Sequence, residues 1–339
     1  MRNFIISDLH GNGFIYDSVL NYLQNELEYG NDDITLYING DLIDRGLDSG
    51  SMLLDVYDRV TNNIGVKIKY LAGNHELFMY EAFKFSEGAK LDTLFEPLFN
   101  KKAGFWISDE AGFVTSRYLI KYSNTEEVYK IMNFIGNLDV YHIFDEKVND
   151  KRILLVHACA LKSMEDNVDL KLGDGSTKTE VALNTRKDSF LVRGKVGNDK
   201  FFTIIGHTPL DNEKYGYLYD PEDNTLNIDG ASALFSFLNT RYLYKNKDPF
   251  TNIIDVVKPF SEYDKDVLND LNHFSHSPLV EILDNKLRIL TFNYKNEIIY
   301  GNYFQDGISI PIDNNEFDKC RKNLVENTKI RKRERRRIS

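Results

Sequence analysis

The chain has 339 residues, of which 42% are hydrophobic and 28% are charged. This composition excludes a disordered or membrane-spanning protein, and the length suffices for one large domain or two ordinary ones. The two cysteines, Cys159 and Cys320, exclude a disulfide framework and predict a reducing, cytoplasmic location. An apolar run begins almost directly after Met1, so we expect no signal peptide and no membrane partner.

The net charge of −10 is divided unevenly along the chain. Residues 317–339 contain ten Lys or Arg against three Asp or Glu, a net charge of +7, which leaves about −17 on residues 1–316. An acidic body disfavours nucleic-acid binding by the main domain, because phosphate backbones require a basic surface. We expect the basic tail to be flexible and solvated, with contact to an anionic partner as the alternative.

Five short apolar runs each end in a polar residue with ligand or catalytic chemistry. The runs lack the alternation of half-exposed strands, and therefore predict strands that are covered on both faces. They are residues 4–6 before Ser7-Asp8, 34–38 before Asn39-Gly40-Asp41, 68–71 before Gly73-Asn74-His75, 153–156 before His157, and 201–205 before Gly206-His207.

Helical periodicity separates the first three of these runs. The apolar stripes are Ile15, Val19, Leu23 and Leu27 in the first segment, and Leu53, Tyr57, Val60 and Ile64 in the second. The order strand–helix–strand–helix–strand predicts a βαβαβ unit and hence an α/β fold that begins with a parallel sheet. Right-handed crossovers would bring Asp8, Asp41 and Asn74 to one edge of that sheet.

The pattern changes beyond residue 237. Four apolar runs with turn residues between them predict a small antiparallel meander, over residues 279–282, 287–292, 298–304 and 308–312. We therefore divide the chain into a main domain (1–237), a β-rich C-terminal extension (238–316) and the basic tail (317–339).

The strand-end residues form a candidate metal site. Asp8 and His10 stand at i and i+2, so in extended backbone both can reach one ion, and the two oxygens of Asp41 can bridge it to a second. The remaining ligands of the second ion would be Asn74, His157 and His207. Imidazole, carboxylate and amide oxygen suit Mn, Fe or Zn better than Ca. Two such ions, roughly 3.5–4 Å apart, clamp a phosphoryl oxygen and supply hydroxide at neutral pH.

Ordered motifs carry a resemblance to a known family. The motifs are Ser7-Asp8-Leu9-His10-Gly11-Asn12, Gly40-Asp41-Leu42-Ile43-Asp44-Arg45-Gly46, Gly73-Asn74-His75-Glu76, Val156-His157, Gly206-His207-Thr208-Pro209 and Asp229-Gly230. Together they resemble the calcineurin-like metallophosphoesterases. The Asp-Arg-Gly sequence resembles the phosphoprotein phosphatase type, which includes serine/threonine phosphatases and bacterial diadenosine tetraphosphatases. The resemblance runs from about residue 5 to residue 230.

The resemblance implies a β-sandwich flanked by helices, with the catalytic domain over residues 1–237. It also implies two divalent metal ions, with Mn²⁺ as the leading candidate and Fe or Zn as alternatives. The implied ligands are Asp8, His10 and Asp41 for the first ion, and Asp41, Asn74, His157 and His207 for the second.

The resemblance further implies four catalytic roles. His75 would be the general acid that protonates the leaving oxygen, and Asp44 would orient its ring. Arg45 would grip the non-bridging phosphate oxygens, where a guanidinium fork fits. Arg193 matches an arginine that some members use for the same purpose. The alternative for Arg45 is a surface ion pair with Asp44 or Asp48.

Other chemically suggestive residues have simpler interpretations. We expect His142 to be structural, and Trp106 to belong to the core or to a pocket wall. Cys159 follows His157 at a position where relatives carry small residues, and we expect a buried thiol there, not a nucleophile. His273 and His276 could share a metal, but a solvated surface is favoured, because no cysteine or carboxylate is arranged around them.

These patterns predict a two-metal phosphomonoesterase that uses a metal-bound hydroxide. The leading substrate is a serine/threonine phosphoprotein, since Arg45 favours an exposed terminal phosphate. A dinucleoside polyphosphate, such as diadenosine tetraphosphate, or a small nucleotide is the first alternative. The second alternative is an inactive binding module, against which the intact ligand set argues. The expected partner is thus a phosphoprotein or a phosphorylated small molecule.

Overall fold

The first of two sheets combines strands from both ends of the chain, in the order β12-β11-β10-β9-β1-β2-β3. Strands β1, β2 and β3 are parallel, whereas β9 to β12 run antiparallel to their neighbours, with β9 paired to β1. The strands are β1 (Arg2–Ile6), β2 (Ile34–Asn39), β3 (Lys67–Leu71), β9 (His276–Leu283), β10 (Lys286–Asn293), β11 (Ile298–Gln305) and β12 (Ile308–Pro311).

This computed structural model describes residues 1–30, 32–85, 105–106, 112–187, 195–210, 214–230, 276–293, 295 and 297–325. Four sequence predictions lie wholly or partly outside these residues: the role of Arg193, the character of His273, the domain boundary at residues 237 and 238, and the flexible tail beyond residue 325.

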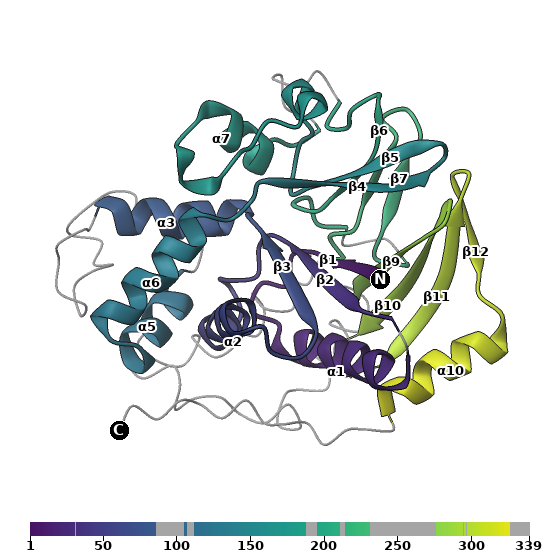
Figure 1. The fold of residues 1–339 in the computed structure, drawn as a ribbon, viewed down its shortest axis with the longest axis horizontal. Coiled ribbons are helices and arrows are strands. Elements are labelled where there is room, and N and C mark those ends of the chain that lie inside the picture. The colour runs from purple at the N-terminus through teal and green to yellow at the C-terminus, as the bar shows by residue number, and fades with distance from the viewer. Residues whose placement is uncertain are drawn as a thin grey trace.

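The second sheet has five strands in the order β4-β5-β6-β8-β7. An antiparallel hairpin, β4 and β5, continues into the parallel strands β6 and β8, and β7 closes the far edge. The strands are β4 (Tyr141–Val148), β5 (Lys151–Val156), β6 (Phe201–Ile205), β7 (Leu218–Asp220) and β8 (Thr225–Asn227). This sheet lies over the first, and α1 and α2 lie on the opposite side of the first sheet (Figure 1).

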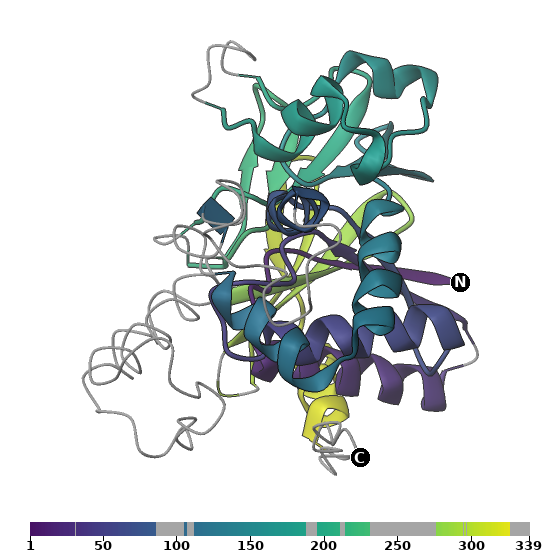
Figure 2. The same cartoon turned by 90° about the vertical axis from the view of Figure 1, so that its left-hand side faces the viewer.

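The helices cover the faces that the sheets leave open (Figure 2). They are α1 (Gly13–Tyr29), α2 (Ser49–Asn62), α3 (Asn74–Phe85), α5 (Phe113–Tyr122), α6 (Thr125–Gly136), α7 (Thr177–Asn184) and α10 (Asn314–Val325), with 3₁₀ turns η2 (Lys162–Asp166) and η3 (Leu172–Asp174). Phe4 and Ile6 belong to the core under these helices, whereas Ile5 belongs to the core between the sheets. The α/β sandwich is therefore confirmed, and so is the two-sided burial of the predicted runs in β1, β2, β5 and β6. The prediction is wrong for β3, which lies at the edge of the first sheet and leaves Lys69 exposed.

The first predicted helical stripe is confirmed and the second is partly wrong. In α1, Ile15, Val19 and Leu23 are buried, and the Asn12 side chain caps the helix by accepting a hydrogen bond from Ile15 N. Helix α2 ends at Asn62, so Ile64 lies beyond it and is 50% exposed, and Val60 is exposed as well. The packed face instead comes from residues 52–56, nearer the helix start.

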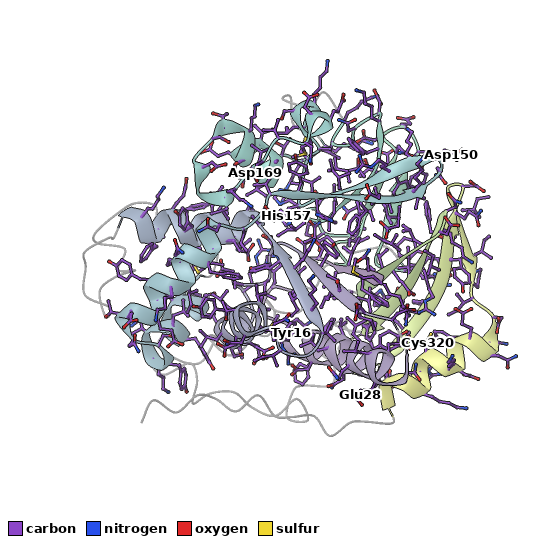
Figure 3. The ribbon with its side chains drawn as sticks, in the orientation of Figure 1. Tyr16, Glu28, Asp150, His157, Asp169 and Cys320 are labelled. Atoms are coloured by element: carbon purple, nitrogen blue, oxygen red, sulfur yellow. The ribbon has the colours of Figure 1, made fainter. Side chains whose placement is uncertain are left out.

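The C-terminal meander is confirmed, but it extends the first sheet through the pairing of β9 with β1. Residues 317–325, which the charge count placed in a flexible tail, lie instead in helix α10. The Asp313 side chain caps this helix by accepting a hydrogen bond from Glu316 N. Cys320 and Leu324 are buried, and Cys320 lies on the α10 face that meets α1 (Figure 3). The apolar side chains of Cys320 and Leu324 therefore pack the first part of the basic segment against the core.

No helix among the described residues has both the length and the apolar character that a membrane crossing needs.

Candidate metal centre

The strand-end residues gather at one edge of the sandwich, as the crossovers require. Asp8, Asp41 and Asn74 follow β1, β2 and β3, and His157 and His207 follow β5 and β6. Figure 3 labels His157 where the second sheet approaches the first beside α3. The carboxyl ends of five strands, three from one sheet and two from the other, therefore supply one site.

The backbone at this edge is unusual. Six of the thirteen described non-glycine residues with a positive φ belong to the predicted site: Asp8, His10, Asp41, Asp44, Arg45 and His207. Left-handed conformations cost free energy and cluster at functional sites. Gly40 has a φ of 77°, and a Cβ there would overlap Gly73 and the His157 ring, so glycine is needed where the loops meet.

A first cluster of ligand atoms surrounds one oxygen of Asp41. Asp41 Oδ2 lies 3.3 Å from His10 Nε2 and 3.9 Å from His75 Nε2. His10 Nδ1 lies 3.1 Å from the Ile43 carbonyl oxygen, to which it donates, and this fixes Nε2 as the lone-pair atom. Such a backbone partner is typical of histidines that ligate metals.

A second cluster surrounds the other oxygen of Asp41. His157 Nε2 lies 3.4 Å from Asp41 Oδ1, and His157 Nδ1 donates to the Asn39 carbonyl oxygen at 2.9 Å. Asn74 Oδ1 lies 3.0 Å from His157 Nε2 and 2.9 Å from His207 Nδ1. Ligand atoms of Asp41, His157 and His207 all lie within 4.8 Å of one another. Asp41 is therefore shared by two candidate ion sites.

Asp8 belongs to neither of these close clusters. Its two oxygens accept hydrogen bonds from His207 N at 3.0 and 3.1 Å, and Ser7 Oγ donates to Oδ2 at 2.5 Å. Burial, and then the neighbouring Asp229 carboxylate, raise the pKa of Asp8 well above its ordinary value. Its assignment to the first ion therefore stays a prediction.

Electrostatics at Asp41 favours an anion held among imidazoles. Burial raises the pKa of Asp41, but His157 and His75 outweigh it and hold the pKa well below its ordinary value. Burial lowers the pKa of His10 to about 3 and that of His207 to about 3, so both rings are neutral at neutral pH. Neutral imidazole is the form that binds metal.

His157 shows how a cation would fit. Burial lowers its pKa, but Asp41 and Asp8 outweigh burial and raise it to about 10, so the ring carries a proton when no cation is near. A divalent ion would replace this proton and also offset the repulsion between the buried carboxylates of Asp8, Asp41 and Asp229. The donor set of imidazole, carboxylate and amide oxygen therefore fits divalent transition-metal ions.

A buried dyad lies beside the first cluster. His75 Nδ1 donates to Asp44 Oδ2 at 2.9 Å, and both side chains are fully buried. Two further donors reach Asp44: Trp106 Nε1 at 2.6 Å and Thr115 Oγ1 at 2.6 Å. Burial raises the pKa of Asp44 to about 7, although these two hydrogen bonds lower it. Trp106, expected as wall or core, is thus also a hydrogen-bond donor to the site, and Thr115 was not anticipated.

Two arginines lie near the clusters. Arg45 Nη1 lies 3.3 Å from His10 Nε2, at the edge of the first cluster. Arg193 lies outside the described residues. The exposed Arg186, which the sequence analysis did not single out, is close enough to help lower the pKa of His207, after burial and His157.

Glu76 ties two site loops together and was missed as well. Its fully buried carboxylate accepts hydrogen bonds from Asp41 N at 2.9 Å, Leu42 N at 3.1 Å and Gly73 N at 2.9 Å. Burial, and then Asp41, raise its pKa to about 7. The signal was present, since Glu76 closes the motif Gly73-Asn74-His75-Glu76, but the motif alone gave it no partner.

Three of the residues with simpler interpretations, His142, Cys159 and His276, supply no atom to the two clusters. His142 on β4 packs against Tyr37 with the two rings tilted by 32°, and its Nε2 lies 3.2 Å from the Tyr37 hydroxyl. His276 begins β9. Cys159 is buried, and burial raises the pKa of its thiol to about 12, so it is not a thiolate at neutral pH.

Most of the chain matches the model of a known protein family. The model of the calcineurin-like phosphoesterases matches residues 1–236. The chain belongs to the calcineurin-like phosphoesterase family. Members bind divalent metals and hydrolyse phosphate esters. The match includes every predicted metal ligand, and it ends before the four strands that complete the first sheet in this chain.

Individual relatives are more distant. The symmetrical bis(5'-nucleosyl)-tetraphosphatases of Salmonella typhi and Salmonella typhimurium are 35% identical over 83 residues, which is 24% of this chain and 26% of the length of those relatives. A cold-active protein-tyrosine phosphatase of a Shewanella species is 14% identical (TM-score 0.40; 90% of this chain, 80% of that chain). A serine/threonine phosphatase of Saccharomyces cerevisiae is 19% identical (TM-score 0.39; 67% and 66%).

Proposed function

We propose that this phosphoesterase is a metal-dependent phosphatase that hydrolyses phosphate monoesters. One observation carries the proposal. Asp41 lies between two sets of ligand atoms, one with His10 and one with His157 and His207. A shared carboxylate between two such sets is the arrangement that a two-metal phosphoryl-transfer centre requires.

The proposed ligands follow the expected division. Asp8, His10 and Asp41 would hold one ion, and Asp41, Asn74, His157 and His207 would hold the other. Two bound ions would withdraw negative charge from the phosphoryl group and activate the attacking water.

The chain's own side chains would bind the phosphate and supply the proton. Arg45, whose Nη1 lies 3.3 Å from His10 Nε2, is near enough to contact non-bridging oxygens of a phosphate held between the clusters. His75 Nε2 would give its proton to the leaving oxygen, while Asp44 holds the opposite ring nitrogen at 2.9 Å and stabilises the imidazolium.

Phosphoserine and phosphothreonine proteins are our first substrate class, because Arg45 suits a terminal, doubly ionised phosphate. The second candidate is a dinucleoside polyphosphate. It is favoured by the 83-residue likeness to the symmetrical tetraphosphatases. An inactive binding module is the least favoured candidate. Inactive relatives usually lose metal ligands, whereas this chain carries a suitable residue at every predicted ligand position.

We also propose Mn²⁺ as the native ion and the cytoplasm as the location. The imidazoles of His10, His157 and His207, together with carboxylate and amide oxygens, form a ligand set that suits Mn²⁺, Fe or Zn. The two cysteines, Cys159 and Cys320, are both free and buried, which supports a reducing compartment.

The first test is hydrolysis of p-nitrophenyl phosphate by the chain purified with Mn²⁺. We expect His75→Asn to lower kcat about 10²- to 10⁴-fold, the range for a lost general acid, and Asp41→Asn to abolish turnover. His142→Asn removes an imidazole outside the site and should keep wild-type activity. Full activity in the His75 and Asp41 variants would refute the proposed roles.

Parallel assays decide between the substrate classes. A phosphothreonine peptide and diadenosine tetraphosphate should be compared at equal enzyme concentration, with phosphate release as the readout for the peptide and nucleotide products, two ADP per symmetrical cleavage, as the readout for diadenosine tetraphosphate. The leading proposal predicts a higher kcat/KM for the peptide. A higher value for diadenosine tetraphosphate would establish the second candidate.

A further inference from the structure

The carboxylate of Asp44 is held by more than its catalytic partner. Its Oδ2 accepts hydrogen bonds from both His75 Nδ1 at 2.9 Å and Trp106 Nε1 at 2.6 Å, and its Oδ1 accepts from Thr115 Oγ1 at 2.6 Å. All four side chains are fully buried. Each oxygen thus has at least one fixed donor, so the carboxylate cannot rotate without losing hydrogen bonds that water does not replace.

The two additional donors come from a part of the chain that supplies no metal ligand. Trp106 lies 62 residues from Asp44, and Thr115, in the first turn of α5, lies 71 residues from it. Gly112 joins them: its N–H donates to the Trp106 carbonyl oxygen at 2.9 Å, and a Cβ there would overlap the indole ring. The indole and the start of α5 therefore pack as one unit.

This unit is anchored to the scaffold behind the Asp41 loop. Helix α5 packs on α2 so closely that a Cβ on Gly50 would overlap the Tyr118 ring. Because α2 follows directly from the loop that carries Asp44, the donors and the acceptor share one rigid support. Side chains that are locked in this way hold a catalytic group in its working orientation.

We infer that Trp106 and Thr115 are positioning residues that act through Asp44 on His75. They fix the carboxylate plane, and they stabilise its ionised form by donating to it. The fixed carboxylate in turn orients the His75 ring, so that Nε2 faces the leaving oxygen as a proton donor. This inference rests on the proposed function, because it needs His75 to be the general acid.

The test exploits leaving-group basicity, since a general acid matters most for a basic leaving oxygen. Trp106→Phe keeps an aromatic ring and removes the N–H, and Thr115→Val keeps the shape and removes the hydroxyl. With Mn²⁺ present, each variant should lower kcat for phenyl phosphate about tenfold. It should lower kcat for 2,4-dinitrophenyl phosphate less than about twofold, with KM unchanged for both substrates.

A purely structural role would reduce both activities equally, and that result would overturn the inference. Thr115→Ser retains a hydroxyl donor, so its kcat for phenyl phosphate should be much closer to the wild-type value than that of Thr115→Val. Ser116→Ala removes the neighbouring hydroxyl, which donates to the Phe113 carbonyl oxygen, and should leave both rates unchanged. If Trp106→Phe does not fold, the Thr115 and Ser116 variants decide the question alone.

A double-mutant cycle locates the effect. In a His75→Asn background, Thr115→Val should cause no further loss with phenyl phosphate, because both changes remove the same proton transfer. If the double variant instead loses the product of the two single losses in kcat, Thr115 does not act through Asp44 and His75, and the inference is contradicted. A wild-type chain inactive on every aryl phosphate would instead refute the proposed function, so the two failures are distinguishable.

Discussion

At the scale of single residues, the sequence allowed us to predict which side chains would be candidate metal ligands, but not which contacts those side chains would make. Asp41, His157 and His207 were predictable because each stands within two residues of the end of an apolar strand and carries ligand chemistry. The structure adds the left-handed backbone of Asp41 and His207, which Asp and His adopt more often than most residues but which their residue type does not dictate.

Residues that act on other residues were much harder to predict. Trp106 and Thr115 reach Asp44 across more than 60 residues of sequence, and no local pattern encodes such a contact. Glu76 was visible in its motif, but its carboxylate accepts hydrogen bonds from backbone N–H groups, which every residue except proline possesses, so the sequence does not mark the donors. The partners of a buried polar side chain therefore required the structure.

Glu76 gives a prediction about stability. Glu76→Gln places an NH₂ group among three backbone N–H donors, so at least one hydrogen bond is lost in a fully buried position. We expect the free energy of unfolding to fall by about 2–3 kcal/mol in urea titrations, together with weaker Mn²⁺ binding, because the Asp41 loop loses its anchor.

The matched control is Glu126→Gln. Glu126 is 79% exposed and pairs with Lys130 on the surface of α6, so its replacement should leave the urea midpoint unchanged. Equal stability of the Glu76 and Glu126 variants would mean that the three backbone hydrogen bonds do not hold the loop.

At the scale of helices and strands, the apolar pattern predicted which strands and helices form, but it did not predict which strands pair with each other. The four C-terminal strands were visible as apolar runs between turn residues, yet nothing local indicated that β9 would pair with β1. Both edges of β1 are thereby occupied, by β2 and β9.

Helix α10 was missed because the charge of residues 317–339 was counted as a whole. Phe317, Cys320 and Leu324 recur at helical spacing and pack against the core, and Asp313 with Glu316 forms a recognisable start signal. The apolar stripe, not the net charge, determined the structure of this segment.

A buried ionic network that involves α10 gives the second prediction. Arg288 on β10 contacts Glu281 at 2.6 Å and Glu316 at 3.2 Å, and Glu281 is only 3% exposed. Arg2 also contacts Glu281, at 2.7 Å. Arg288→Met leaves a buried carboxylate short of one cation, so we expect the free energy of unfolding to fall by about 3 kcal/mol in urea titrations.

Arg152→Met is the control for this change. Arg152 is 47% exposed and its partner Asp145 is 98% exposed, so solvent already screens the pair. If both arginine variants shift the urea midpoint by the same amount, the network adds nothing beyond a surface ion pair.

At the scale of the whole molecule, one edge of the sandwich combines the loops of both sheets into a single candidate centre. The family match ends at residue 236, whereas the first sheet gains four strands from residues 276–311. Val280, Ile289 and Phe304 from these strands belong to the core between the sheets. The α/β sandwich could be predicted from sequence, but this continuity could not, because it depends on pairing between the two ends of the chain.

The central claim is that two divalent ions bind around Asp41, and counting bound Mn²⁺ tests it most directly. The chain should be stripped with a chelator, dialysed against Mn²⁺, and analysed for metal and protein by mass spectrometry. We predict two ions per wild-type chain, one per chain in His207→Ala, and fewer than one in Asp41→Asn, because Asp41 serves both clusters. A wild-type chain that binds no Mn²⁺, or an Asp41→Asn chain that keeps two ions, would contradict the claim.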